Sequence, residues 1–187
     1  FLAGFSLGGN FTLRIAADRG TDLGLKSAVA ISPPVDPVNA MAALNQGSFI
    51  YKKYFMHRWT NSLRKKLAHF PDYDFGPELE SAKTFDEMNQ FFVPKYTEFK
   101  DAESYFRSYA LTGDRLRDLA IPAHLITAAD DPIIPVADLD KINCPTMLNL
   151  EVHPYGGHCG FIMNLRAQSH MEPRLVELFD SYLALRA

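Results

Sequence analysis

The sequence has few cysteines, and neither stands where a metal site or a disulfide framework would need it. Cys144 and Cys159 are the two cysteines among 187 residues, and no C-x-x-C spacing joins them. Structural zinc sites and small disulfide-bonded folds need several cysteines at close, regular spacings. We therefore expect two free thiols and no metal, and free thiols favour a cytoplasmic protein.

Long apolar runs and an excess of basic charge are also missing. No stretch of the sequence approaches the roughly 18 consecutive apolar residues that a membrane-spanning helix needs. The formal net charge is -3 and no nucleic-acid-binding motif is present, so a nucleic-acid partner is not expected. With 47% hydrophobic and 22% charged residues, the composition fits one globular domain or most of one.

What is present is an alternation of short apolar runs and helical patterns. Runs rich in small and β-branched residues predict buried strands, and apolar positions at helical spacing predict helices. Strands are expected at 1–4, 26–32, 123–129 and 148–152, and helices at 7–17 and, starting near Pro173, within 166–186. Strands that alternate with helices favour a mostly parallel α/β sheet. We divide the chain into a core segment at 1–35, a helical insertion at 36–117 and a second core segment at 118–187.

The insertion is rich in aromatic residues and has a divided charge pattern. Residues 51–70 carry six Lys and Arg without an acid, whereas residues 72–87 carry six acids against Lys83. Solvated helix faces are the simpler interpretation, and peripheral contact of the basic segment with an anionic membrane is the alternative. We expect most of the aromatic side chains to form the insertion's own core. As a whole, the insertion is expected to cover the carboxyl edge of the sheet as a lid and to supply an acyl pocket.

Residues 4–8, within "FLAGFSLGGN", have the pattern G-x-S-x-G centred on Ser6. A serine hydroxyl becomes a nucleophile when a base takes its proton and N–H donors hold the resulting oxyanion. A strand before Ser6 and a helix after it form a sharp turn that raises the side chain, and Gly4 and Gly8 leave room for that turn. The helix that begins at Leu7 directs free N–H groups toward the same point, so the Leu7 N–H is the expected first oxyanion donor. The alternative is a serine in an ordinary glycine turn.

The base that Ser6 needs is sought among six histidines. These are His57, His69, His124, His153, His158 and His170. His158 is flanked by glycines just past a predicted strand, where a flexible loop can carry an imidazole into a site. His153 is the nearest competitor, but it lies at the end of that strand and precedes Pro154. The other four lie in helical, strand or linker segments that suggest no catalytic role, so we choose His158.

An acid that fixes the tautomer of the imidazole is expected at the end of another strand. Asp130 and Asp131 directly follow the predicted strand at 123–129, and the carboxyl ends of strands are where open α/β sheets place their sites. From position alone, either residue could be the acid. The chain order serine, acid, histidine is the order found in α/β-hydrolases.

With these residues identified, the chain resembles the α/β-hydrolase superfamily, and within it the bacterial YheT-type hydrolases and the related eukaryotic ABHD group. The resemblance is carried by "GFSLGGN" at 4–10, "SPPVD" at 32–36, "TFDE" at 84–87, "DAESYFRSYA" at 101–110, "IP" at 121–122, "AADDPIIP" at 128–135 and "YGGHCGF" at 155–161. It implies an α/β-hydrolase fold with a helical cap insertion, Ser6 as nucleophile, His158 as base and Asp131 as acid. Asp130 is then a neighbour that caps the turn. Ala128, where many such enzymes have glycine, and Tyr109, where this group has a small hydroxyl residue, depart from the pattern.

The resemblance also implies that several strands and the second oxyanion donor precede the nucleophile. We therefore predict that the sequence is the C-terminal part of a longer protein, with the N-terminal strands of the fold absent.

These observations together predict a serine hydrolase that cleaves carboxylic esters of apolar acyl or short lipid-like substrates through Ser6, His158 and Asp131. No metal or organic cofactor is expected. One alternative is a non-catalytic binding protein that keeps the scaffold, since fold does not imply function. Another is the same triad acting on thioesters or phospholipids. The residues do not predict an oligomeric state.

Overall fold

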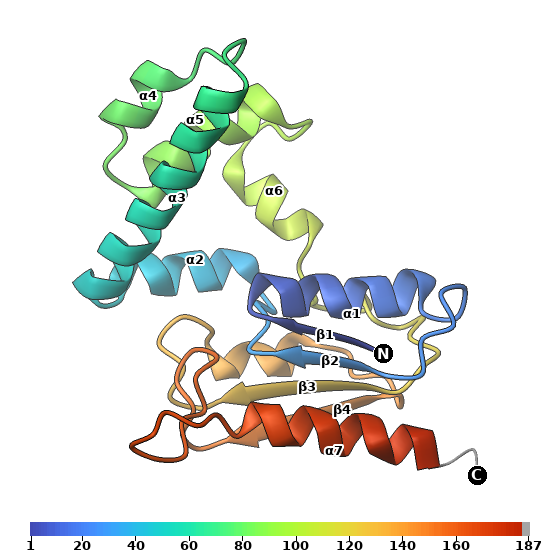
Figure 1. Ribbon diagram of the computed structural model, residues 1–187. Coiled ribbons are helices and arrows are strands. Elements are labelled where there is room, and N and C mark those ends of the chain that lie inside the picture. The colour runs from blue at the N-terminus through green and yellow to red at the C-terminus, as the bar shows by residue number, and fades with distance from the viewer. Residues whose placement is uncertain (185–187) are drawn as a thin grey trace.

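The framework of the computed structural model, which describes residues 1–184, is a sheet of four parallel strands. The strands are β1 (Leu2–Phe5), β2 (Ala28–Ile31), β3 (Ala123–Ala128) and β4 (Leu148–His153), and they lie in the order β1-β2-β3-β4. Every neighbouring pair is parallel, so all four carboxyl ends meet at one edge of the sheet, where the arrowheads lie in Figure 1. The predicted α/β fold with a parallel sheet is thereby confirmed.

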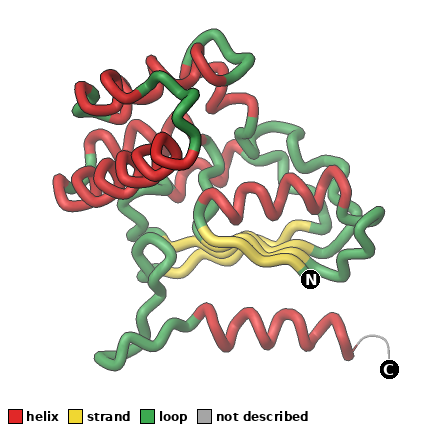
Figure 2. Tube along the Cα trace, turned by 45° about the horizontal axis from the view of Figure 1, so that its top comes forward, coloured by secondary structure: helices red, strands yellow, loops and turns green. Residues whose placement is uncertain are grey.

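Helices α1 (Leu7–Arg19) and α7 (Met171–Ala184) cover opposite faces of this sheet (Figures 1 and 2). Alternate side chains of a strand point to opposite faces, so a strand in the middle of the layers must be apolar throughout. All four residues of β2 are buried; Ala30 packs in the cluster that contains Leu13 of α1, and Val29 packs in the cluster that contains Leu178 of α7. The small and β-branched composition of β2 thus follows from its place between two helices.

Five helices lie between β2 and β3 in the chain. They are α2 (Pro37–Gln46), α3 (Phe49–His69), α4 (Gly76–Ser81), α5 (Phe85–Tyr96) and α6 (Ala102–Ser108). Figure 1 shows α3, α4 and α5 standing away from the sheet, on the side of its carboxyl edge. They form a core of their own, in which the buried side chains of Phe75 and Met88 pack with Trp59 and Phe92.

A polar cluster joins the start of α2 to the segment between β3 and β4. Asp36 caps this helix, because its Oδ1 accepts hydrogen bonds from Val38 N at 3.1 Å and Asn39 N at 3.4 Å. Its Oδ2 lies 2.7 Å from Lys141 Nζ, at the end of a 3-10 helix (Val136–Lys141) that the sequence did not predict. Lys141 also contacts the buried Asp138 at 2.9 Å. Among residues 1–184, no helix is both long and apolar enough to span a bilayer.

Candidate active site

Ser6 occupies a sharp turn between β1 and α1, and its backbone is strained. Its φ of 50° and ψ of -124° lie outside the backbone regions that residues other than glycine favour, and this conformation costs about 1–3 kcal/mol. A hydrogen bond of 2.8 Å from Ser6 N to Ile31 O helps to hold the turn. A Cβ on Gly4 would lie 2.3 Å from Gly8 O and 2.6 Å from Thr12 Oγ1. Glycine is required at position 4 because β1 and α1 approach so closely there.

His158 and Asp131 meet Ser6 at the carboxyl edge of the sheet. Ser6 Oγ lies 3.0 Å from His158 Nε2, although 152 residues separate them in the chain. On the other side of the ring, His158 Nδ1 lies 3.0 Å from Asp131 Oδ2. The side chain of Asp131 is fully buried, and that of His158 is 10% exposed. The three side chains predicted from the sequence thus form a continuous serine–histidine–carboxylate chain of contacts.

The two oxygens of Asp131 have separate tasks. Oδ1 accepts hydrogen bonds from the backbone N–H groups of Ile133 at 2.9 Å and Ile134 at 3.0 Å. These bonds close the turn after β3 and leave Oδ2 directed at His158. A hydrogen bond to Nδ1–H selects the tautomer in which Nε2 can accept the proton of Ser6.

The environment of His158 favours its charged form. Burial of the ring lowers the pKa of His158, but the hydrogen bond to Asp131 and the neighbouring sulfur of Cys159 outweigh this effect, and the pKa rises to about 9. An imidazolium at this position is the species that forms when Ser6 gives up its proton. The site therefore stabilises the charge that nucleophilic attack by Ser6 would create.

Comparisons with known proteins show which proteins the chain is similar to. No protein-family profile matches the chain. An abhydrolase domain-containing protein of Dictyostelium discoideum is 29% identical over 190 residues, which are 98% of this chain and 47% of that protein. YheT of Escherichia coli (strain K12), an esterase by provisional name, is 27% identical over 191 residues, which are 98% of this chain and 56% of YheT. The chain thus spans about half the length of the curated relatives it matches.

Solved structures show the same fold at low sequence identity. A serine hydrolase from the polyaromatic-hydrocarbon-degrading bacterium Cycloclasticus zankles is 19% identical with a TM-score of 0.51, and the match covers 97% of this chain and 63% of that one. Est1E from Butyrivibrio proteoclasticus is 17% identical with a TM-score of 0.51, covering 98% and 61%. The chain therefore resembles the α/β-hydrolase superfamily. Within it, the curated relatives confirm the resemblance to the YheT-type group.

Asp130 does not have the turn-capping role expected from the sequence. Asp131 closes that turn, whereas Asp130 Oδ1 accepts hydrogen bonds from Gly156 N and Gly157 N, both at 2.8 Å. These glycines belong to the loop that carries His158. Position directly after a strand could not distinguish the two aspartates, because their partners lie more than 20 residues further along the chain.

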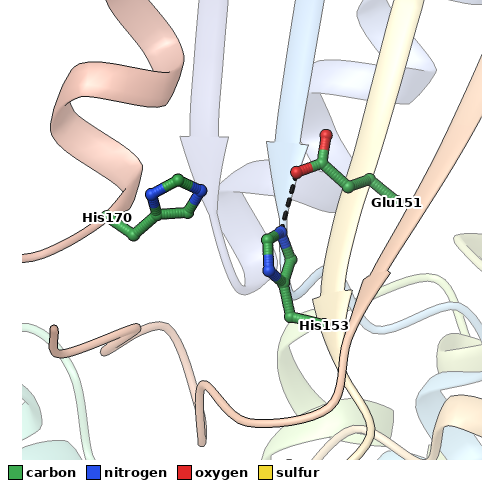
Figure 3. A group of neighbouring side chains, drawn as sticks. All are labelled: Glu151, His153 and His170. Atoms are coloured by element: carbon green, nitrogen blue, oxygen red, sulfur yellow. Dashed lines mark hydrogen bonds and ion pairs between the residues drawn. The ribbon is translucent and has the colours of Figure 1, made fainter.

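The remaining histidines lie away from Ser6. His57 and His69 are exposed on α3, as expected. His124 is buried within β3, where its Nε2 lies 2.9 Å from Tyr182 Oη, and burial lowers its pKa. His153, the competitor of His158, bonds to Glu151 instead of Ser6, and His170 lies beside this pair (Figure 3).

Sequence reasoning missed one buried side chain that supports the site. Asn10 of α1 is fully buried, and its Nδ2 donates hydrogen bonds of 2.9 Å to Pro34 O and to Tyr109 O. Pro34 precedes the helical segment and Tyr109 follows it, so one amide joins both of its ends to the helix that begins after Ser6. The "GGN" extension of the serine motif was the available signal, but the sequence does not show what the amide contacts.

Proposed function

We propose that the protein is a serine hydrolase that cleaves carboxylic esters of apolar acyl or short lipid-like substrates. Ser6 Oγ attacks the ester carbonyl while His158 Nε2 accepts the hydroxyl proton, and Asp131 orients and stabilises the imidazolium. His158 then returns the proton to the leaving alkoxide as the acyl-serine forms. Water, deprotonated by His158, releases the acid and restores Ser6.

The observation that carries this proposal is the pair of 3.0 Å contacts on the two sides of the His158 ring. Ser6 also stands at the N-terminal end of α1, where the first backbone N–H groups of a helix have no partner within it. The Leu7 N–H is the first oxyanion donor in this scheme. Charge that develops on the carbonyl oxygen is stabilised there by the N–H dipole and by the positive end of the helix.

The helical segment is proposed to act as a lid beside this site. Ile133 and Ile134, whose N–H groups bind Asp131, pack with their side chains against Ala40 and Leu44 of α2 and Phe85 of α5. The turn that holds the acid is therefore shared between the sheet and the lid. Apolar side chains at this junction favour an apolar acyl group over a charged one.

Activity-based labelling tests this proposal. We expect a fluorophosphonate probe to label the protein at Ser6, as located by mass spectrometry, and Ser6→Ala and His158→Ala to abolish labelling. His69→Ala, an exposed histidine on α3, is the matched control and should label like the unmodified protein. A folded protein that never labels would contradict the hydrolase and leave a binding protein on the same scaffold.

Substrate class is tested next, on matched esters, thioesters and phospholipids of equal acyl length. We expect the highest kcat/KM for carboxylic esters, and we expect kcat/KM to rise with the length of the acyl chain. A preference for thioesters or phospholipids would keep the triad and change the substrate assignment.

Peripheral membrane contact is the second property that we propose, through the beginning of α3. Phe49 and Ile50 are 71% and 77% exposed, and Lys52 and Lys53 stand beside them. Exposed apolar side chains next to lysines are typical of helices that lie on an anionic membrane. Binding to phosphatidylserine vesicles should fall with salt and should be lost when the lysines at 52, 53, 65 and 66 are neutralised; salt-insensitive or absent binding would dismiss it.

A further inference from the structure

Three side chains that could bind a metal ion gather outside the triad. Glu151 and His153 stand two residues apart on β4, so their side chains leave the same face of the strand. His170 directly precedes α7, and Figure 3 shows its ring facing the other two side chains. His153 Nε2 donates to Glu151 Oε1 at 2.7 Å, and the rings of His153 and His170 lie 5.3 Å apart.

The geometry of these groups suits one small cation. One ligand atom from each of the three residues lies within 4.8 Å of the others. A tetrahedral zinc ion with bonds of about 2.0–2.2 Å places its ligand atoms roughly 3.3–3.6 Å apart. Side-chain rotations that move the atoms by about an ångström are therefore enough. Glu151 and His153 are about a quarter exposed, so an ion can reach them from solvent.

A neighbouring arginine orients the carboxylate of this cluster. Arg174 of α7 binds Glu151 Oε2 through Nε at 3.1 Å and through a terminal nitrogen at 2.7 Å. This pair leaves Oε1 on the side of the histidines, and partners of this kind commonly orient the ligands of metal sites. Its positive charge also opposes a cation, which predicts moderate affinity.

We propose that Glu151, His153 and His170 bind a single divalent transition-metal ion of the Zn²⁺ type. Two imidazole nitrogens and one carboxylate oxygen form a ligand set that zinc accepts, with a fourth position open to water. Imidazole ligands favour Zn²⁺, Ni²⁺ or Cu²⁺ over Mg²⁺ and Ca²⁺. A metal ion binds only an unprotonated ring nitrogen. When His153 binds the ion through one nitrogen, its proton is therefore on the other ring nitrogen, which can donate a hydrogen bond.

The position of the cluster gives the ion a structural role. His153 ends β4 and His170 stands immediately before α7, so the two ligands enclose the segment 154–169, which contains His158. An ion that joins them closes this segment at its base. The inference does not depend on the hydrolase proposal, because binding at this cluster does not require a reactive Ser6.

Equilibrium dialysis of the metal-free protein against ZnCl₂, followed by metal analysis, tests the site. We expect one Zn²⁺ per chain, at least about tenfold weaker binding in His153→Ala, His170→Ala and Glu151→Gln, and no competition from Mg²⁺. His69→Ala is the control for adventitious binding to an exposed histidine and should bind like the unmodified protein. Circular dichroism, compared before zinc is added, establishes that each variant is folded.

Hydrogen exchange provides a second readout that is independent of activity. Zn²⁺ should slow exchange in 154–169 in the unmodified protein and leave it unchanged in His170→Ala, since that variant lacks one of the two histidine ligands that enclose this segment. Equal zinc binding in the unmodified protein and in the folded ligand variants, or no binding at all, would overturn the proposal. Glu151 would then only pair with His153 on β4 and join β4 to α7 through Arg174.

Discussion

At the scale of single residues, His158 is the group that connects the site to pH. Its contacts raise the pKa to about 9, with Asp131 and Cys159 outweighing the opposite effect of burial. A general base must be neutral to accept a proton, and the neutral fraction grows until the pH passes the pKa.

We therefore expect kcat/KM for ester hydrolysis to rise with pH and to level off near pH 9. Asp131→Asn removes the carboxylate that favours the imidazolium, so the inflection should move to lower pH and kcat should fall by a factor on the order of 10⁴. A pH–rate profile on a p-nitrophenyl ester, with Ser6→Ala as the blank, measures both. An inflection that does not move in Asp131→Asn would contradict the assigned pair.

The same raised pKa affects stability in a defined pH window. Because the folded pKa lies above the ordinary value of 6.5, its contribution is fully present below pH 6.5 and is lost as the pH rises through about 9. The free energies of unfolding of the unmodified protein and of His158→Gln, measured with urea, should therefore differ most at acidic pH. A difference of the same size at pH 6 and at pH 10 would exclude this contribution to stability.

At the scale of elements, the crossing of β1 and α1 distinguishes the two glycines of the serine motif. A Cβ at Gly4 meets Gly8 O at 2.3 Å, whereas a Cβ at Gly8 meets nothing within 4 Å. Gly4→Ala should lower the free energy of unfolding by about 1–3 kcal/mol, as overpacking against a backbone does. Gly8→Ala should leave it unchanged or raise it by up to about 1 kcal/mol, because alanine favours the helix. Urea unfolding of both variants measures these free energies. An equal loss of stability in the two variants would show that the close approach of Gly4 to Gly8 O is unimportant.

Asn10 joins three elements of the chain, and its removal should be costly. Asn10→Ala leaves the buried carbonyl of Pro34 and the partly buried carbonyl of Tyr109 without their donor, and an unsatisfied buried group costs about 1–3 kcal/mol. Asn143→Ala removes an exposed hydrogen bond to Asp114 and should change stability by no more than about 0.5 kcal/mol. Urea denaturation of the pair measures the difference. Similar values would mean that Asn10 does not hold the two ends of the helical segment.

At the scale of the whole molecule, the surface around β1 is apolar. Among residues 1–184, β1 pairs only with β2, so one side of it is a sheet edge. The exposed large apolar side chains on and around β1 and α1 are Phe1, Phe5, Leu7, Phe11 and Ile15. An unpaired strand edge and exposed apolar side chains are surfaces that other protein segments can cover.

The sequence predicted the parts of this molecule that local patterns determine. The apolar run 26–32 contains β2, and the glycines around Ser6 and His158 identified the two residues that now lie 3.0 Å apart. What it did not predict are contacts between distant residues that carry no recognisable motif. The bonds of Asn10 span up to 99 residues, and His170 meets Glu151 across a loop, so no local pattern marks either contact.

The all-parallel sheet, finally, has a consequence for the order in which the chain folds. Parallel strands cannot pair through a tight hairpin, and more than 90 residues separate the paired strands β2 and β3. The helices between them close only short loops, whereas contact of Ser6 with His158 must wait for almost the entire chain. During refolding from urea, helical circular dichroism should therefore recover before the serine becomes reactive. We therefore expect the contact between Ser6 and His158 to be among the last to form, after the segment 154–169 has reached its place.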